Sequence, residues 1–289
     1  MRLYKYLPPA RIDVLESLQI RFSPPVSTND RFELKPVVKG WASREIAMAK
    51  IVPRFRDFFS KADTPEKMLQ VSIENHPEAE SVFRESMRRL GPEVWFQLMK
   101  NLTERNFENA AASVHEFVEH NWATISEKFL QTLGTQVGIL SLSQDARNPA
   151  MWGNYSDSSR GFVIGFDAAH PWFNQKRSED DDFCHVRRVS YVSDNPTKYF
   201  SDLTAQDALY SKLEAWSYEK EWRMIFPLKD GIDTNTLDSF GQPIVLFPVP
   251  EDCLVEVIIG SRAAAETARR IQEVCEKPSR RVSVSRGST

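Results

Sequence analysis

The hydrophobic pattern of the chain changes near residue 135, and this change constrains the fold more than any other feature. Between residues 41 and 133 apolar side chains recur at helical spacing. The end of this block shows the pattern in Ala111, Val114, Phe117, Val118, Trp122 and Ile125. From residue 137 onward the chain instead has short β-rich segments separated by turn residues. The pattern therefore predicts a helical block followed by a sheet.

The strand-like segments decide the fold class. The expected strands in the second half are residues 137–143, 161–167, 186–192, 218–226, 244–249 and 254–259, with helices near 203–213 and 262–275. Because short turns join most of these strands, we expect an α+β fold with a mixed, mostly antiparallel sheet. Residues 1–35 also contain strands but are too few to bury a core alone. We therefore expect a single domain, 1–289, whose sheet core comes from 1–35 and 137–289, with 41–133 as an all-helical insertion.

Composition narrows the class of protein. The 289 residues are 41% hydrophobic and 27% charged, as in an ordinary globular protein, and the formal net charge of −3 argues against a non-specific nucleic-acid binder. Cys184, Cys253 and Cys275 have no metal-ligand spacing, so neither a zinc site nor a disulfide framework is predicted. The N-terminus lacks a signal peptide and no apolar run could span a membrane. We expect a cytoplasmic protein with no membrane partner.

The most informative local feature is the expected strand at residues 218–226. Side chains alternate along a strand, so Glu219, Glu221 and Arg223 would share one face, with the two carboxylates about 7 Å apart. Neighbouring carboxylates repel each other, and such pairs serve general-base chemistry or stabilise a developing cation. The alternative is a solvated strand face whose carboxylates pair with arginines across the sheet.

Aromatic residues form a second candidate feature. Asn148 and Pro149 can open a short helix that places Met151, Trp152 and Tyr155 on one side. Such a cluster is usually part of a core, and the functional alternative is a platform for a flat ring such as nicotinamide or adenine.

Two N-terminal segments add a third feature. Tyr4, Lys5 and Tyr6 lie in a short expected strand, with Lys5 facing away from the two tyrosines. Further on, Asp30 and Glu33 belong to a polar turn, and they could instead supply carboxylates to a hard metal ion. The sequence lacks the glycine-rich phosphate loops and the HExxH zinc motif, and no metal ligand set is predicted.

Taken together, these segments resemble a bacterial domain-of-unknown-function family, family 2971. Its members share an LYKY-like strand and the motifs FS.P...ND.FE, MW..Y, VSY and K...W.YE.EWR. The corresponding segments here are residues 3–6, 22–33, 140–166, 189–191 and 212–223. Arg31 departs from the pattern, because the family more often has proline there.

A more distant likeness is to ADP-ribosyltransferases, which also combine an N-terminal strand, an aromatic middle element and a late strand with a decisive glutamate. The resemblance implies a transferase that uses NAD, as a toxin or an anti-phage defence effector. It implies that Glu221 binds the ribose hydroxyl and stabilises the ribosyl cation, and that Glu219 orients the acceptor. The implied contacts to NAD come from Lys5, Tyr6, Arg147, Trp152, Tyr155 and Arg223.

Two other functions remain open at this point. One is a metal-dependent nuclease or phosphodiesterase, with Asp30, Glu33, Glu219 and Glu221 around Mg²⁺ and with Lys220 or Lys212 near the phosphate. The other is a non-catalytic interaction or regulatory module, in which the helical insertion docks a partner protein. The sequence identifies no acceptor, whether protein or nucleic acid.

Overall fold

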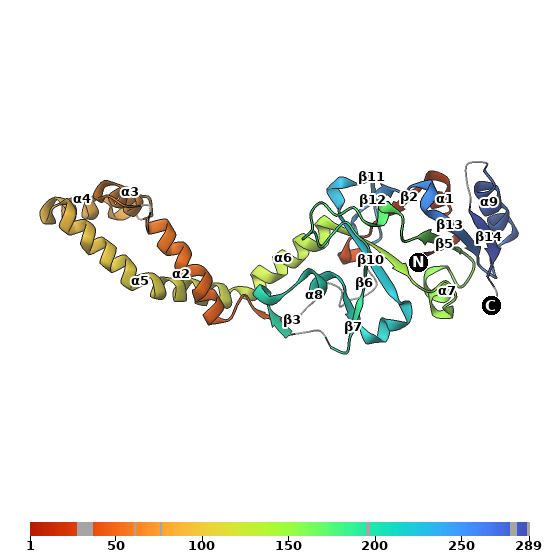
Figure 1. Cartoon of the computed structure of the whole chain (residues 1–289), viewed down its shortest axis with the longest axis horizontal. Helices are drawn as coiled ribbons and strands as arrows, with labels where there is room; N and C mark the ends of the chain where they lie inside the picture. The colour runs from red at the N-terminus through yellow and green to blue at the C-terminus, as the bar shows by residue number, and fades with distance from the viewer. Residues whose placement is uncertain (28–36, 61, 76, 195–196, 278–281, 288–289) are drawn as a thin grey trace. The chain divides into compact units, whose positions relative to one another are not determined.

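The computed structural model describes residues 1–27, 37–60, 62–75, 77–194, 197–277 and 282–287 (Figure 1). The chain forms two compact units. The first, the sheet unit, comprises Met1–Val37, Glu127–Thr197 and Leu203–Thr289. The second, the helical unit, comprises Val38–Ser126 and Lys198–Asp202.

The sheet unit is built on seven strands in the order β14-β13-β5-β1-β4-β10-β6 (Figure 1). Their bounds are β1 Arg2–Leu7, β4 Val137–Ser143, β5 Phe162–Asp167, β6 Arg187–Arg188, β10 Glu221–Pro227, β13 Leu254–Ile259 and β14 Ser283–Arg286. β14 pairs parallel to β13, and the other neighbours pair antiparallel. The predicted α+β class with a mixed, mostly antiparallel sheet is confirmed.

The sheet is split between β1 and β4. Their register joins Tyr4 to Ser143, whereas β1 pairs with β5 along its whole length and β4 pairs with β10 along its whole length. On the far part of β4, Ile139 bridges instead to Ser23, with N–O distances of 3.0 and 2.8 Å. The two wings of the sheet therefore diverge from Tyr4 and Ser143, and residues 23–27 run beside the diverging edge of β4.

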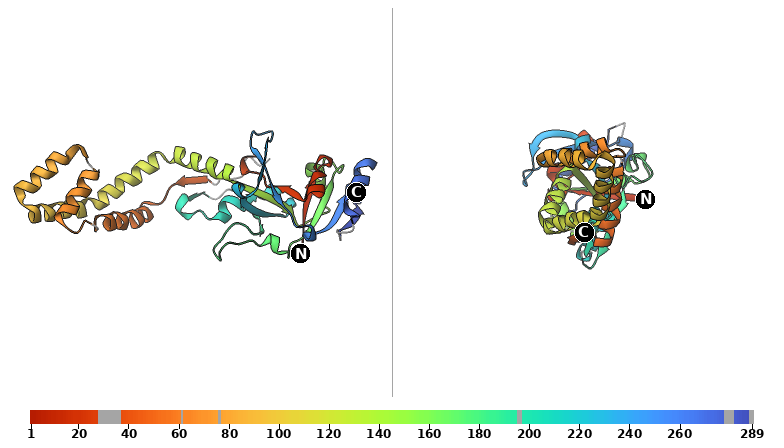
Figure 2. Two further views of the ribbon diagram at one scale, coloured as in Figure 1. Left: turned by 90° about the horizontal axis from the view of Figure 1, so that it is seen from above. Right: turned by 90° about the vertical axis from the view of Figure 1, so that its left-hand side faces the viewer.

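Smaller elements flank this sheet (Figure 2). β2 Gln19–Arg21, β11 Ile232–Leu237 and β12 Pro243–Pro248 form a three-stranded sheet, and β7 Ser190–Val192 pairs parallel to β9 Ser211–Leu213. Apolar side chains from both sheets make one core, which includes Leu140, Leu142, Met224, Phe226, Val245 and Phe247. The short helix α1 (Asp13–Ser17) is tied to α9 (Ala265–Cys275) by the Glu16–Arg270 ion pair.

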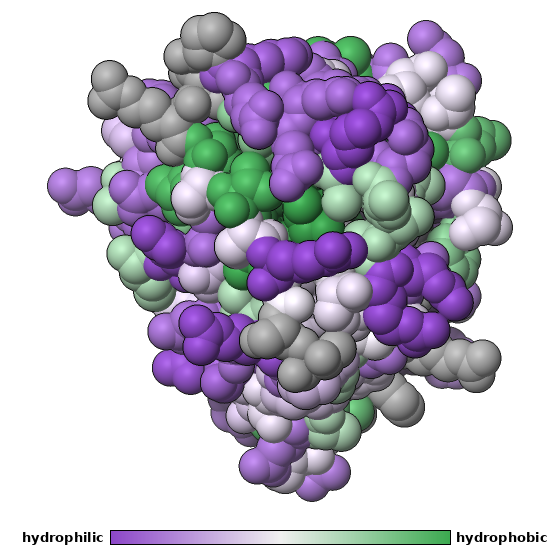
Figure 3. All heavy atoms as spheres, turned by 90° about the vertical axis from the view of Figure 1, so that its right-hand side faces the viewer, coloured by the Kyte–Doolittle hydropathy of each residue, from purple (hydrophilic) through white to green (hydrophobic). Residues whose placement is uncertain are grey.

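The end of the sheet unit seen in Figure 3 presents hydrophilic side chains with smaller apolar areas between them. In the part of the chain that the structure describes, no helix combines the length and apolarity needed to cross a membrane.

The helical unit follows the predicted helical signals closely. Its helices are α2 Arg44–Ser60, α3 Pro65–Asn75, α4 Glu80–Leu90 and α5 Pro92–His120, and α6 Trp122–Gln136 begins in it. Proline occupies the first position of α3 and of α5, where its missing N–H costs nothing. Thr64 caps α3 by accepting from the Lys67 N–H at 3.3 Å. A core of Ala62, Met68, Trp95 and Phe96 holds these helices together.

The prediction of one strand over 218–226 is wrong at its start. Residues Glu214–Glu219 form a 3₁₀ turn, η6, which closes when the Lys220 N–H donates to the Ser217 carbonyl at 3.2 Å. Lys220 is left-handed (φ 46°), and β10 begins only at Glu221. Tyr218 therefore shares no strand face with Trp222 and Met224. The expected helix at 203–213 is likewise shorter, with α8 at Ala205–Leu209 and β9 following it.

Candidate functional site

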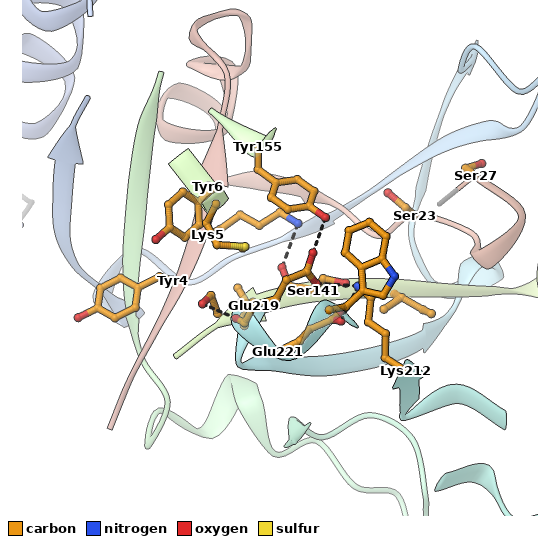
Figure 4. Close-up of a pocket in the computed structure, with 15 residues that line it drawn as sticks. Tyr4, Lys5, Tyr6, Ser23, Ser27, Ser141, Tyr155, Lys212, Glu219 and Glu221 are labelled. Carbon is orange, nitrogen blue, oxygen red and sulfur yellow. Dashed lines mark hydrogen bonds and ion pairs between the residues drawn. The ribbon is translucent and has the colours of Figure 1, made fainter. Parts of the chain in front are cut away.

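A pocket of about 180 Å³ lies in the fork of the split sheet (Figure 4). β1 contributes Tyr4, Lys5 and Tyr6 to its lining. The opposite wing contributes Ser141, Ser143 and Glu221, the turn before β10 contributes Trp216 and Glu219, and β9 contributes Lys212. Segments more than 200 residues apart in the sequence thus meet because the two wings share only the junction at Tyr4 and Ser143.

Two buried carboxylates share one ammonium in this pocket. Lys212 Nζ lies 2.6 Å from Glu219 Oε2 and 3.1 Å from Glu221 Oε2. Both glutamates are 3% exposed. The alternative of a solvated strand face is therefore wrong for Glu219 and Glu221. The left-handed Lys220 reverses the chain between them, so the two carboxylates meet through a turn and not by strand alternation.

Glu221 is further held by a buried arginine. Arg223 Nε donates to Glu221 Oε1 at 2.9 Å, and Arg223 Nη2 donates to Oε2 at 3.2 Å. Burial alone would raise the pKa of Glu221, but Arg223 and Lys212 outweigh it and lower the pKa to about 2. The Lys212 pKa is shifted too: burial acts to lower it, and the two carboxylates raise it well above its ordinary value. Glu221 and Lys212 are therefore both ionised at neutral pH.

Glu219 has a different set of partners. The Tyr155 hydroxyl donates to Glu219 Oε1 at 2.6 Å. Burial, together with the Glu219 charge, raises the pKa of Tyr155, so this hydroxyl keeps its proton. Glu219 therefore shares the Lys212 ammonium with Glu221, and its other hydrogen bond comes from an uncharged hydroxyl. Glu221 accepts two further hydrogen bonds from the charged Arg223.

The helix that carries Tyr155 is fixed to the carboxylate turn. α7 (Pro149–Tyr155) is the short helix predicted at Asn148 and Pro149. The Asn148 side chain accepts from the N–H groups of Ala150 and Met151, which caps the helix. Its Nδ2 also donates to the Tyr218 carbonyl at 2.8 Å. One side chain therefore caps α7 and ties it to η6, one residue before Glu219.

Lys5 reaches across the fork from the other wing. Its Nζ donates to the Ser141 carbonyl at 3.0 Å. Burial lowers the pKa of Lys5 to about 8, although the nearby Glu221 charge acts in the opposite direction. Lys5, Lys212 and Arg223 together carry three positive charges against the two of Glu219 and Glu221. This cluster therefore has one surplus positive charge at neutral pH, which favours a ligand with an anionic group.

The structure brings together five of the residues predicted for the site. Lys5, Tyr6, Tyr155, Glu219 and Glu221 all line the pocket. The roles assigned to them remain predictions.

The other three predicted residues lie outside the pocket lining. Trp152 packs behind it, edge-on to Tyr6 with ring centroids 5.4 Å apart, and its Nε1 donates to the Ala146 carbonyl. Arg223 is fully buried against Glu221. Arg147 is exposed on the loop before α7. Trp152 and Arg223 therefore support the pocket from behind.

Lys212 and Trp216 also line the pocket. The sequence placed Lys212 only in the nuclease alternative, near the phosphate, and it did not predict Trp216 as a site residue. Lys212 Nζ lies 5.0 Å from the centroid of the Trp216 ring. Both residues belong to the K...W.YE.EWR motif, so the motif itself was the signal that could have identified them.

Within the described ranges, no group of three or more His, Cys, Asp and Glu side chains could hold a metal ion. Asp30 and Glu33, which the metal-dependent alternative requires, lie outside the described residues.

Comparison with known proteins agrees with the resemblance seen in the sequence. Residues 151–224, about a quarter of the chain, match the model of a family described as protein of unknown function (DUF2971). The matched segment runs from α7 into β10 and includes Tyr155, Lys212, Trp216, Glu219 and Glu221. No curated protein and no solved structure matches the chain.

Proposed function

We propose that the pocket binds NAD and that the chain is an ADP-ribosyltransferase-like enzyme. One observation supports this most strongly: β1, α7 and the η6–β10 turn converge on a single pocket. That pocket combines buried carboxylates, aromatic rings and the ammonium groups of Lys5 and Lys212. A dinucleotide that carries a flat ring, ribose hydroxyls and a pyrophosphate presents a matching group to each of these features.

The reaction would take place at the nicotinamide ribose. The bond between ribose C1′ and the nicotinamide nitrogen breaks, and nicotinamide leaves with the bonding electron pair. The ribose then carries oxocarbenium character, which a fixed carboxylate stabilises. A nucleophilic atom of the acceptor bonds to C1′ and loses its proton, which completes the transfer.

We assign the carboxylate beside the ribose to Glu219 and a positioning role to Glu221. The charge of Glu221 is already balanced by the two hydrogen bonds from Arg223. Glu219 shares Lys212 and otherwise receives only the neutral Tyr155 hydroxyl, which leaves more of its charge to act on a developing cation. The resemblance implied that Glu221 stabilises the ribosyl cation, and the present assignment gives that role to Glu219.

Lys5 is the cation best placed for the pyrophosphate. It is the charged lysine of the β1 wing, and its described hydrogen bond is to a neutral carbonyl, that of Ser141. The pocket volume is about 180 Å³, below the roughly 300–1,000 Å³ typical of sites that enclose a drug-sized ligand. The pocket would therefore hold one end of the dinucleotide, with the remainder lying outside it.

A matched pair of variants tests this proposal. Glu219→Gln keeps the size of the side chain and removes its charge, and its one amide oxygen can still accept a hydrogen bond from Lys212. Glu214→Gln makes the same change on an exposed residue of the same turn. We expect Glu219→Gln to lower the rate of nicotinamide release from NAD by about 100-fold or more, as when one electrostatic contact to a transition state is removed. Glu214→Gln should stay within about twofold of the unmodified protein.

Circular dichroism should show that both variants are folded. Equal rates for Glu219→Gln and Glu214→Gln would contradict the assignment. Hydrolysis of a phosphodiester that EDTA abolishes and Mg²⁺ restores, without nicotinamide release, would favour the metal-dependent alternative.

A further inference from the structure

Trp216 is more exposed than four other tryptophans of the chain. Trp95, Trp122, Trp152 and Trp172 are each 9% exposed or less and lie among apolar side chains. Trp216 is only half-buried, lines the pocket, and has a lysine ammonium and the Tyr218 ring as neighbours. A large aromatic ring placed beside charged groups in a pocket, and not in a core, is typical of a residue that contacts a ligand.

The 3₁₀ geometry of η6 relates Trp216 to Glu219. In a 3₁₀ helix, side chains three residues apart lie directly above one another, and the rise over three residues is about 6 Å. Trp216 and Glu219 are three apart within Glu214–Glu219. The indole and the carboxylate therefore project from the same side of one turn, at a spacing that suits two adjacent groups of one ligand.

Lys212 fixes the indole from one side. Its ammonium lies 5.0 Å from the ring centroid and is anchored by Glu219 and Glu221. The positive charge of Lys212 is offset by these two carboxylates, so it does not repel a ring that approaches the indole. A cation–π contact of this kind holds the indole in place at little cost in side-chain freedom.

We propose that Trp216 stacks against the nicotinamide ring of NAD and that the η6 turn thereby places the attached ribose at Glu219. This inference rests on the proposed function, and it names the end of the dinucleotide that enters the pocket. The stacking residue is then Trp216 and not Trp152, which lies behind Tyr6.

The two products of NAD cleavage separate this inference from the proposed function, because neither is consumed. Nicotinamide and ADP-ribose are each titrated into the full chain, its Trp216→Ala variant and its Trp216→Phe variant, with binding followed by NMR. Loss of one aromatic stacking contact corresponds to roughly tenfold in affinity. We expect Trp216→Ala to bind nicotinamide about tenfold more weakly and ADP-ribose within about twofold of the unmodified chain. Trp216→Phe, which keeps a flat ring, should recover most of the nicotinamide affinity.

A matched control removes an exposed aromatic ring elsewhere. Phe240 is 56% exposed and lies between β11 and β12, and Phe240→Ala should change neither titration. If Trp216→Ala binds nicotinamide as tightly as the unmodified chain, the stacking role is overturned while the proposed function stands. The same holds if the unmodified chain binds ADP-ribose but not nicotinamide. An unmodified chain that binds neither product would overturn both.

Discussion

The ion pairs of the helical unit and the buried charge cluster of the sheet unit use the same types of residue in different ways. In the helical unit, ion pairs such as Asp63–Lys67 and Glu80–Arg84 join side chains one helical turn apart, and each partner is 46–61% exposed. In the sheet unit, Lys212, Glu219, Glu221 and Arg223 are each 8% exposed or less, and each bonds to at least one other member.

This difference has energetic consequences. Exposed pairs on a helix contribute only about 0.3–0.5 kcal/mol each, because water solvates both ions nearly as well. Removing one partner of a buried pair costs about 3–5 kcal/mol, because the other charge is then left without compensation in a medium that solvates it poorly. Such a cluster is a weak source of stability as a whole, yet it holds its members in fixed positions. That property suits a binding site better than a scaffold.

The largest expected effect is the loss of Arg223. Arg223→Ala leaves Glu221 buried without its arginine, and we expect the free energy of unfolding to fall by about 3–5 kcal/mol. Arg84→Ala in the helical unit should change it by less than about 0.5 kcal/mol. Urea denaturation measures both. Similar losses for the two variants would remove the contrast between the units.

Acid should lower the stability of the sheet unit, because it protonates the buried Glu221 carboxylate. Because the pKa of Glu221 is lowered from 4.5 to about 2 on folding, its contribution to stability is present above pH 4.5 and is lost as the pH falls to 2. The shift corresponds to about 3 kcal/mol. Denaturation of the full chain between pH 5 and 2 should show this loss, and Glu221→Gln should show a shallower one. Glu93→Gln, on an exposed residue of α5, should follow the unmodified chain, and a Glu221→Gln curve as steep as that of the unmodified chain would contradict the prediction.

A smaller effect is expected from Lys5 at alkaline pH. Since its pKa is lowered to about 8, Lys5 loses its charge as the pH rises through 8, and the affinity for ADP-ribose should fall with it. A charge-assisted hydrogen bond corresponds to roughly tenfold in affinity. Calorimetry between pH 7 and 9 should show this decrease. Lys5→Met should bind about tenfold more weakly at pH 7 and show no such pH dependence, whereas Lys229→Met, on an exposed lysine, should behave as the unmodified chain.

The sequence predicted those parts of the structure that local rules determine. Asn148 and Pro149 gave the start of α7, and Thr64 and Pro65 gave the start of α3, because capping depends on neighbouring residues alone. The fold class followed from strand composition and short turns. Local patterns singled out Lys5, Tyr6, Tyr155, Glu219 and Glu221, the resemblance grouped them as one site, and the pocket brings them together.

The 3₁₀ turn before β10 could not be predicted in this way. Residues 218–226 alternate like a strand, and no local signal marks Lys220 as left-handed. The turn instead brings Glu219 and Glu221 to the same ammonium of Lys212, which is seven residues before Glu219. Contacts from a distant segment hold that arrangement, such as the hydrogen bond from Asn148 to the Tyr218 carbonyl, and a window of sequence around the turn does not contain them.

A crystal structure of the Glu219→Gln variant with NAD tests the central claim most directly, since this variant should bind the dinucleotide without cleaving it. We expect a nicotinamide ring against Trp216, the attached ribose beside residue 219 and a phosphate oxygen within hydrogen-bond distance of Lys5 Nζ. NAD bound elsewhere on the chain, or a fork that stays empty at saturating NAD, would contradict it.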